Sequence, residues 1–159
     1  MFEIVYRSKA TSVFSEQDLK SLLLQARSAN EANDITGLLV FDGVFFVQII
    51  EGGKRNCELL YEKIRNDDRH QDVETLWSQG ANSLNTRTFS EWSMGYTHTA
   101  PGALRTDTEF WHEYMNANRD DLSHGARLFR LLAELPGFGS RNGFVNKQFG
   151  RIDPSFFSI

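Results

Sequence analysis

Two apolar segments joined by Asp42-Gly43 constrain the fold more than any other feature of this sequence. The segments run from Ile35 to Phe41 and from Val44 to Glu51. Asp-Gly between apolar runs is the strongest short-range signal for a β-hairpin, because it supplies the positive φ that a tight turn needs. The second segment is apolar on both faces, since Phe45, Val47 and Ile49 alternate with Val44, Phe46 and Ile50. A strand of this kind is predicted to lie inside a sheet that is covered on both sides.

Segments with the apolar spacing of strands and segments with the apolar spacing of helices alternate on either side of this hairpin. Phe2 to Ser8 alternates as a strand, and Ser15 with Asp18 forms a predicted capping box before a helix. The apolar stripe of that helix is Leu19, Leu22, Leu23 and Ala26, and the helix ends at residues 30–34, which favour turns. A second helix follows Gly52-Gly53, and its stripe is Cys57, Leu60, Tyr61 and Ile64.

Two further strands are predicted from Val73 to Ser78 and from Trp92 to Thr97. The order β-α-β-β-α-β-β is that of a ferredoxin-like α+β sheet with one added strand, and it places both helices on one face. After Pro101-Gly102 the pattern becomes helical. Thr106 and Glu109 form a second predicted capping box before Phe110, Trp111, Tyr114 and Met115, and another helix runs from about Leu122 to Leu135.

These last helices are expected to cover the opposite face of the sheet. The final segment, Phe138 to Ile159, also carries Phe144, Phe149, Phe156 and Phe157 among Gly, Ser and Asn, and it is equally consistent with an ordered tail or a partner-binding arm. We therefore predict two regions. Residues 1–97 form a domain, and residues 98–159 form a C-terminal helical extension with an aromatic tail.

Charge and cysteine content limit the function classes. The formal net charge of −4 argues against a nucleic-acid partner, which usually requires a basic surface. The single Cys57 and the absence of a leader sequence indicate a reduced, cytoplasmic protein. The most apolar stretch, Ile35 to Ile50, is too short and too interrupted to span a membrane.

Common catalytic and nucleotide-binding motifs are missing. Gly52-Gly53-Lys54-Arg55 lacks the upstream Gly and the following Ser or Thr of a phosphate-binding loop. The four His residues have no metal-ligand spacing, and Cys57 lies on an apolar helix stripe, where a buried thiol is inert. We therefore expect no metal and no enzymatic activity.

Gln48 is the polar residue that the pattern does not explain. Alternation places it on the same face as Phe46 and Ile50, in the middle of the central strand. A buried amide without partners costs about 1–3 kcal/mol, so another group must bond to it. Tyr6 lies on the first strand, which neighbours this one in a ferredoxin-like sheet, and its hydroxyl also needs a partner. The two can satisfy each other, either as a structural pair or as a pair that presents a donor to a ligand.

A series of short fragments recurs in one order and at one spacing along the first part of the chain. They are Tyr6-Arg7-Ser8, Asn30, Asn33–Leu39, Phe46-Val47-Gln48, Glu51-Gly52, Leu60-Tyr61, Asp67–His70, Arg87-Thr88-Phe89 and Trp92-Ser93-Met94. In these fragments, over about residues 1–97, the sequence resembles the BLUF domain family, the sensors of blue light using FAD.

The resemblance implies a flavin held between the two helices, taken as FAD, with FMN or riboflavin open. Carried over by position, Tyr6 and Gln48 are the photoactive pair. Asn30 bonds the pyrimidine side of the ring and Arg69 its carbonyl edge. The same end of the cleft is lined by Asp67 and His70, its apolar walls are Leu22, Phe46 and Ile64, and the last strand supplies Trp92 and Met94.

Several of these residues also have ordinary structural interpretations, since Asn30 suits a helix end and Arg69 and His70 suit the negative end of a helix. Arg27 and Lys63 either meet a phosphate tail or lie on solvated helix faces. Ala29 stands where some family members carry a polar or imidazole side chain.

The function that the resemblance implies is a blue-light photoreceptor that signals to a downstream protein or within a homo-oligomer. A light-independent ferredoxin-like interaction module and a flavin reductase are the alternatives. No dinucleotide fingerprint is present to support the reductase.

Overall fold

The computed structural model describes residues 1–80, 87–90, 93–104, 108–117 and 124–136. Its elements follow the order β1 (Phe2–Ala10), α1 (Glu16–Ala32), β2 (Thr36–Phe41), β3 (Phe45–Gly52), α2 (Lys54–Arg65), β4 (His70–Gly80), β5 (Gly95–His98), α3 (Thr108–Ala117) and α4 (His124–Ala133). The predicted α+β order is confirmed.

A single five-stranded sheet has the strand order β4-β1-β3-β2-β5. β3 is central and pairs antiparallel with β1 on one side and β2 on the other, and β5 runs parallel to β2. The β1–β3 register places Tyr6 directly opposite Gln48. β1 and β3 are therefore neighbouring strands, as the predicted contact between Tyr6 and Gln48 requires.

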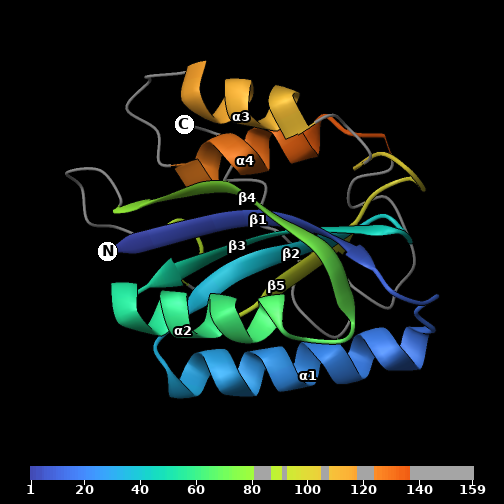
Figure 1. The fold of residues 1–159 in the computed structure, drawn as a ribbon, viewed down its shortest axis with the longest axis horizontal. Helices are drawn as coiled ribbons and strands as arrows, with labels where there is room; N and C mark the ends of the chain where they lie inside the picture. Colours follow the sequence, from blue (N-terminus) through green and yellow to red (C-terminus); the bar gives the residue numbers. More distant parts are fainter. Residues whose placement is uncertain (81–86, 91–92, 105–107, 118–123, 137–159) are drawn as a thin grey trace.

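Both faces of the sheet are covered, as the apolar pattern of β3 predicted. Figure 1 shows α1 and α2 along one face and α3 and α4 along the other. On the α1/α2 face the core contains Ile4, Leu22, Leu23, Phe46, Ile50 and Tyr61. On the α3/α4 face it contains Val5, Val47, Ile49, Trp111, Leu128 and Leu132. Alternate side chains of β1 and β3 thus belong to two separate cores, one on each face of the sheet.

Local sequence signals account for most element boundaries. The Ser15 side chain accepts a hydrogen bond from the Asp18 backbone N–H, and the Asp18 carboxylate accepts from the Ser15 N–H, which completes the predicted capping box at the start of α1. After α1, Asp34 has φ 51°, and in the hairpin turn Gly43 has φ 93°. Both positions lie where short polar residues and glycine are tolerated.

Two strands differ from their predicted bounds. β4 begins at His70 and ends at Gly80, beyond the predicted Val73–Ser78, because it pairs with β1 along nearly its whole length. β5 begins at Gly95, later than the predicted Trp92. Trp92, Thr106 and the tail Phe138–Ile159 lie outside the described residues. No helix among the described residues is long and apolar enough to cross a membrane.

Candidate functional site

A cavity of about 230 Å³ lies between α1, α2 and the sheet. Its lining combines a mostly apolar slot with a few polar groups. The lining residues are Tyr6, Leu22, Gln25, Ala26, Ala29, Asn30, Leu39, Gln48, Leu60, Lys63, Ile64, Asp67, Arg69 and His70.

Helical spacing explains how α1 and α2 form the walls. Residues 22, 25, 26, 29 and 30 of α1 recur at intervals of three and four, and so do residues 60, 63 and 64 of α2. Side chains at these intervals lie on one face of a helix. Apart from Gln25, Asn30 and Lys63, these residues are apolar, so the two helices present hydrophobic walls to whatever occupies the slot.

The sheet side of the cavity carries the Tyr6–Gln48 pair. The Tyr6 hydroxyl donates a hydrogen bond to the Gln48 amide oxygen, and both side chains are buried. The Gln48 amide nitrogen donates to the Met94 sulfur at 3.4 Å. Burial raises the pKa of Tyr6 well above its ordinary value. The phenol therefore stays protonated and acts as a hydrogen-bond donor at any ordinary pH.

Two side chains of α1 hold the segment that leads into β5. Asn30, which is fully buried, donates from Nδ2 to the Ser93 carbonyl oxygen at 2.7 Å. Arg27 donates from Nε to the Met94 carbonyl oxygen at 2.9 Å. Asn30 and Gln48 therefore line the cavity and also contact residues 93 and 94.

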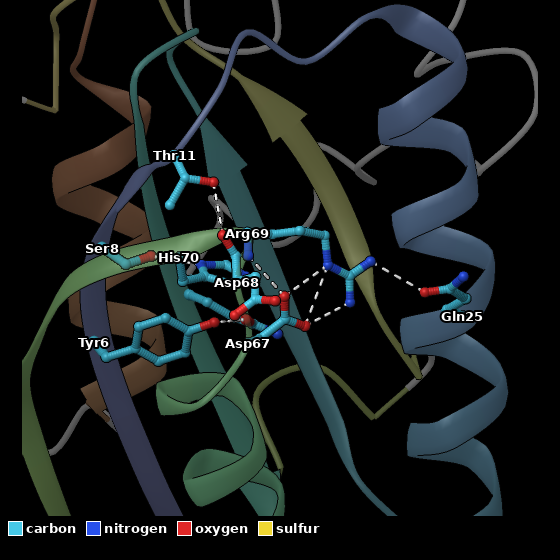
Figure 2. A network of polar contacts seen from close by, with 9 residues as sticks. Tyr6, Ser8, Thr11, Gln25, Asp67, Asp68, Arg69 and His70 are labelled. Carbon is cyan, nitrogen blue, oxygen red and sulfur yellow. Dashed lines mark hydrogen bonds and ion pairs between the residues drawn. The ribbon is translucent and has the colours of Figure 1, made fainter.

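A charged cluster closes one end of the cavity, where α2 leads into β4 (Figure 2). The Arg69 guanidinium binds the Asp67 carboxylate, with Nη2 to Oδ2 at 2.6 Å and Nε to Oδ1 at 2.9 Å. A third donor, Nη1, reaches Gln25 Oε1 on α1 at 3.1 Å. The hydrogen bonds from Arg69 lower the pKa of Asp67 to about 2. Arg69 thus links the turn that follows α2 to α1 through its own donors.

His70 lies deeper than this cluster. Its Nδ1 is 2.8 Å from the Ser8 hydroxyl, and its ring centroid is 6.4 Å from that of Tyr6 and 5.0 Å from that of Phe46. Burial lowers the pKa of His70 despite the nearby Asp67 carboxylate. The imidazole is therefore biased towards its neutral form beside Tyr6.

Most residues that the sequence predicted at the site line this cavity, namely Tyr6, Leu22, Asn30, Gln48, Ile64, Asp67, Arg69 and His70. Phe46 and Met94 do not. Phe46 stacks on Phe41 in the core, with ring centroids 4.3 Å apart, and Met94 contacts the site through Gln48. Of the two basic residues considered for a phosphate tail, Lys63 lines the cavity and Arg27 does not. Trp92 lies outside the described residues.

Sequence reasoning missed Gln25, Leu39 and Leu60 as lining residues and gave Ala26 only a core position. Gln25 lies three residues after Leu22 and four before Ala29, so the helical interval itself was the signal that could have found it.

The donor set fits a flat ring with a polar edge. Asn30, Gln48 and Arg69 bring two amides and a guanidinium to a slot whose other walls are largely apolar. Such a slot can hold an aromatic ring between hydrophobic side chains while amide groups bond its carbonyl and N–H edge. Within the described part of the chain, no group of His, Cys, Asp and Glu side chains could hold a metal ion.

Comparison with known proteins finds similar sequences and similar folds. The α subunit of a photoactivated adenylate cyclase from Euglena gracilis is 41% identical over 73 residues, which are 46% of this chain but only 7% of that protein. The solved dark-state structure of the BLUF protein BlrB has a TM-score of 0.57 and 31% identity, and the match covers 61% of this chain and 71% of that one. The photo-activated state of BlsA has a TM-score of 0.60 and 27% identity, and that match covers 84% of this chain and 93% of BlsA.

The sequence profile described as "BLUF: Sensors of blue-light using FAD" matches residues 1–95. The described part of those residues has the same fold as the solved BLUF proteins, and the polar residues that the resemblance named lie around one cavity. This chain therefore belongs to the BLUF family of flavin-binding blue-light sensors.

Proposed function

We propose that this protein is a blue-light photoreceptor that binds FAD in the cavity between α1 and α2. The observation that carries the proposal is the Tyr6–Gln48 hydrogen bond in the sheet wall of that cavity. A buried phenol and a buried amide that bond each other, and that also face an apolar slot, are positioned to exchange partners with a ligand.

Asn30 and Arg69 are proposed to hold the polar edge of the ring, with Leu22, Leu60 and Ile64 as its apolar walls. Asp67 orients the Arg69 guanidinium by two hydrogen bonds, so the cation is positioned before the ligand arrives. Lys63, on the same helix face as Leu60 and Ile64, is the residue that we assign to the charged tail of FAD.

Bound flavin supplies light absorption and, once excited, a strong one-electron oxidant. Tyr6 is the nearby donor that this fold supplies, and its raised pKa keeps the phenol protonated until it has given up an electron. Gln48 Oε1 already accepts the hydrogen bond of that proton, so it receives the proton as the electron leaves. When both return to Tyr6, the Gln48 amide can settle with its oxygen and nitrogen facing different partners. No substrate is consumed.

The Gln48 amide also contacts Met94, so its rearrangement changes a contact outside the cavity. We propose that the output is altered association with another protein or between copies of this chain, not catalysis, and that the protein acts in the cytoplasm. Residues 1–97 are the proposed sensing domain, and residues 98–159 the proposed extension that passes the signal on.

The test is an absorption spectrum of the purified protein before and after blue light. We expect a yellow protein whose flavin band shifts reversibly to longer wavelength without lasting bleaching. Denaturation and chromatography should release FAD. A colourless protein that also does not bind added flavin would favour the light-independent interaction module. A flavin that bleaches and is reoxidised only by added acceptors would favour the reductase.

A further inference from the structure

Glu51 lies on β3 three residues after Gln48 but on the opposite face of the sheet. Gln48 faces the cavity, whereas Glu51 shares its face with Val47 and Ile49, which pack in the α3/α4 core. The carboxyl is completely buried. A buried carboxyl is costly unless its oxygens are hydrogen-bonded, so its partners define its role.

Those partners lie on two other parts of the chain. Glu51 Oε1 accepts the backbone N–H of Thr88 at 2.9 Å, and Oε2 accepts the N–H of Phe89 at 3.0 Å. The Thr36 hydroxyl on β2 donates to Oε2 at 3.4 Å. Burial raises the pKa of Glu51, while the N–H donors of Phe89 and Thr88 pull it down. Two backbone donors on consecutive residues hold the carboxyl and the 88–89 turn in one fixed arrangement.

Helix α4 packs directly on this arrangement. A Cβ atom at Gly125 would lie 2.7 Å from the Thr88 hydroxyl and 3.0 Å from Glu51 Oε1. The first turn of α4 approaches the carboxyl so closely that only glycine fits without a shift. Phe89, also buried, packs in the same core as Trp111 and Leu128.

The cavity side and the α3/α4 side of the sheet are close to each other along β3. Thr88 and Phe89 donate to Glu51, which faces the α3/α4 core, whereas Ser93 and Met94 accept from Asn30 and Gln48, which line the cavity. A change at Gln48 has a short physical connection to Gly125 through β3, because Glu51 lies three residues along the same strand and beside Gly125.

We propose that Glu51 is a positioning residue that couples the Gln48 hydrogen-bond change to helix α4, an inference that rests on the proposed photoreceptor function. Its carboxyl clamps the 88–89 turn between β3 and the first turn of α4. When Gln48 rearranges, β3 carries the change to Glu51, and the clamp passes it through the 88–89 turn to α4.

The experiment measures amide hydrogen exchange of residues 124–133 in dark and illuminated full-length protein, together with the flavin red shift. Glu51→Gln keeps the side-chain size but leaves one acceptor for two N–H donors. Gly125→Ala keeps the carboxyl and favours the helix intrinsically, but its Cβ forces Thr88, Glu51 or α4 to shift and so disturbs the clamp. Glu58→Gln on the exposed side of α2 is the control for loss of one carboxylate.

We expect the red shift to survive in all three variants. The light-minus-dark difference in α4 exchange should fall about fivefold or more in Glu51→Gln and Gly125→Ala, the lower end of usual coupling strengths, and stay unchanged in Glu58→Gln. If Glu51→Gln does not fold, Gly125→Ala decides alone.

A merely structural role predicts a different result: faster exchange in dark and light alike, with the difference preserved. That result overturns the inference, as does a wild-type protein that shows the red shift without any change in α4. A wild-type protein that binds flavin without a red shift contradicts the proposed function itself, so the two failures are distinguishable.

Discussion

The amide nitrogen of Gln48 donates a hydrogen bond to the Met94 sulfur, 3.4 Å away, while the amide oxygen of the same side chain accepts from Tyr6. Thioether sulfur is a weak acceptor, so this contact holds the amide in its present orientation only lightly. An amide that rotates would turn its oxygen towards the sulfur and lose the bond. The Met94 contact therefore favours the arrangement seen here over the rotated one.

Met94→Leu should lengthen the lifetime of the illuminated state. The change removes the sulfur acceptor, worth about 0.5–1 kcal/mol, and so lowers the driving force for Gln48 to return. We expect dark recovery of the flavin band to slow about twofold to fivefold, with the red shift retained. Met115→Leu, a buried change on the α3/α4 side, is the control. Recovery that is unchanged or faster in Met94→Leu would contradict this account.

Tyr6→Phe should bind flavin and lose the red shift, because the phenol supplies both the electron and the proton. Tyr61→Phe is a matched control: its ring centroid lies 5.3 Å from that of Tyr6, but its hydroxyl lies 2.8 Å from Thr75 Oγ1 on β4. The control should keep the photocycle. Gln48→Leu should behave like Tyr6→Phe. Light-minus-dark spectra of the three variants give the result, and a normal red shift in Tyr6→Phe would remove Tyr6 from the assigned role.

Much of this fold follows from short-range signals in the sequence. The Asp42-Gly43 turn, the Ser15–Asp18 capping box and the two-faced apolar pattern of β3 each act within a few residues, so they are legible without tertiary information. The Tyr6–Gln48 pair also followed, since alternation gave each residue its face and the strand order made the strands neighbours.

The bounds of β5 depended on contacts that no local pattern contains. Trp92, Met94 and Tyr96 alternate like a strand, but the carbonyls of Ser93 and Met94 accept hydrogen bonds from Asn30 and Arg27 instead of from a neighbouring strand. Phe46 was predicted as a wall of the cavity. It lies on the predicted face of the sheet, beneath α1 and α2, but its ring stacks on Phe41 across the hairpin and packs in the core.

Gly37→Ala should destabilise the fold strongly. A Cβ at Gly37 on β2 would collide with the Ile49 carbonyl oxygen of β3, and backbone cannot give way cheaply in a central strand pair. Forced backbone shifts of this kind cost about 1–3 kcal/mol or more. At Gly53 a Cβ meets nothing within 4 Å, so Gly53→Ala should cost less. Urea unfolding of both variants measures the difference, and equal midpoints would show that the β2–β3 contact relaxes freely.

Acidification should destabilise the protein through His70. Burial lowers its pKa in the folded state, so the unfolded chain binds a proton at a higher pH than the folded one. Stability is then constant above the unfolded value near pH 6.5 and falls as the pH drops below it. His70→Gln, which keeps a polar group beside Ser8, should make the thermal midpoint depend less on pH between about pH 7.5 and 5.5. An unchanged pH dependence in this variant would assign the effect to another group.

Asp67→Asn should weaken flavin binding without abolishing the red shift of the protein that does bind. Asp67 holds Arg69 through the guanidinium Nε and Nη2 atoms and also accepts the Arg69 backbone N–H at 2.9 Å, so the neutral amide loses the charge-assisted part of the clamp. An Arg69 that must be ordered on binding costs about 0.5–1.5 kcal/mol, which corresponds to roughly a twofold to twelvefold weaker affinity. Glu74→Gln is the matched control, because Glu74 forms an ion pair with Arg7 at 2.8 Å and neither residue lines the cavity.

Arg69 lowers the pKa of Asp67 to about 2, so the Asp67 carboxylate stays charged throughout the range in which His70 titrates. Flavin affinity of Asp67→Asn should therefore lie below that of the wild type throughout this range, as flavin fluorescence titrations would measure. If the affinity matched the wild type, Asp67 would have no part in positioning Arg69 for the cofactor.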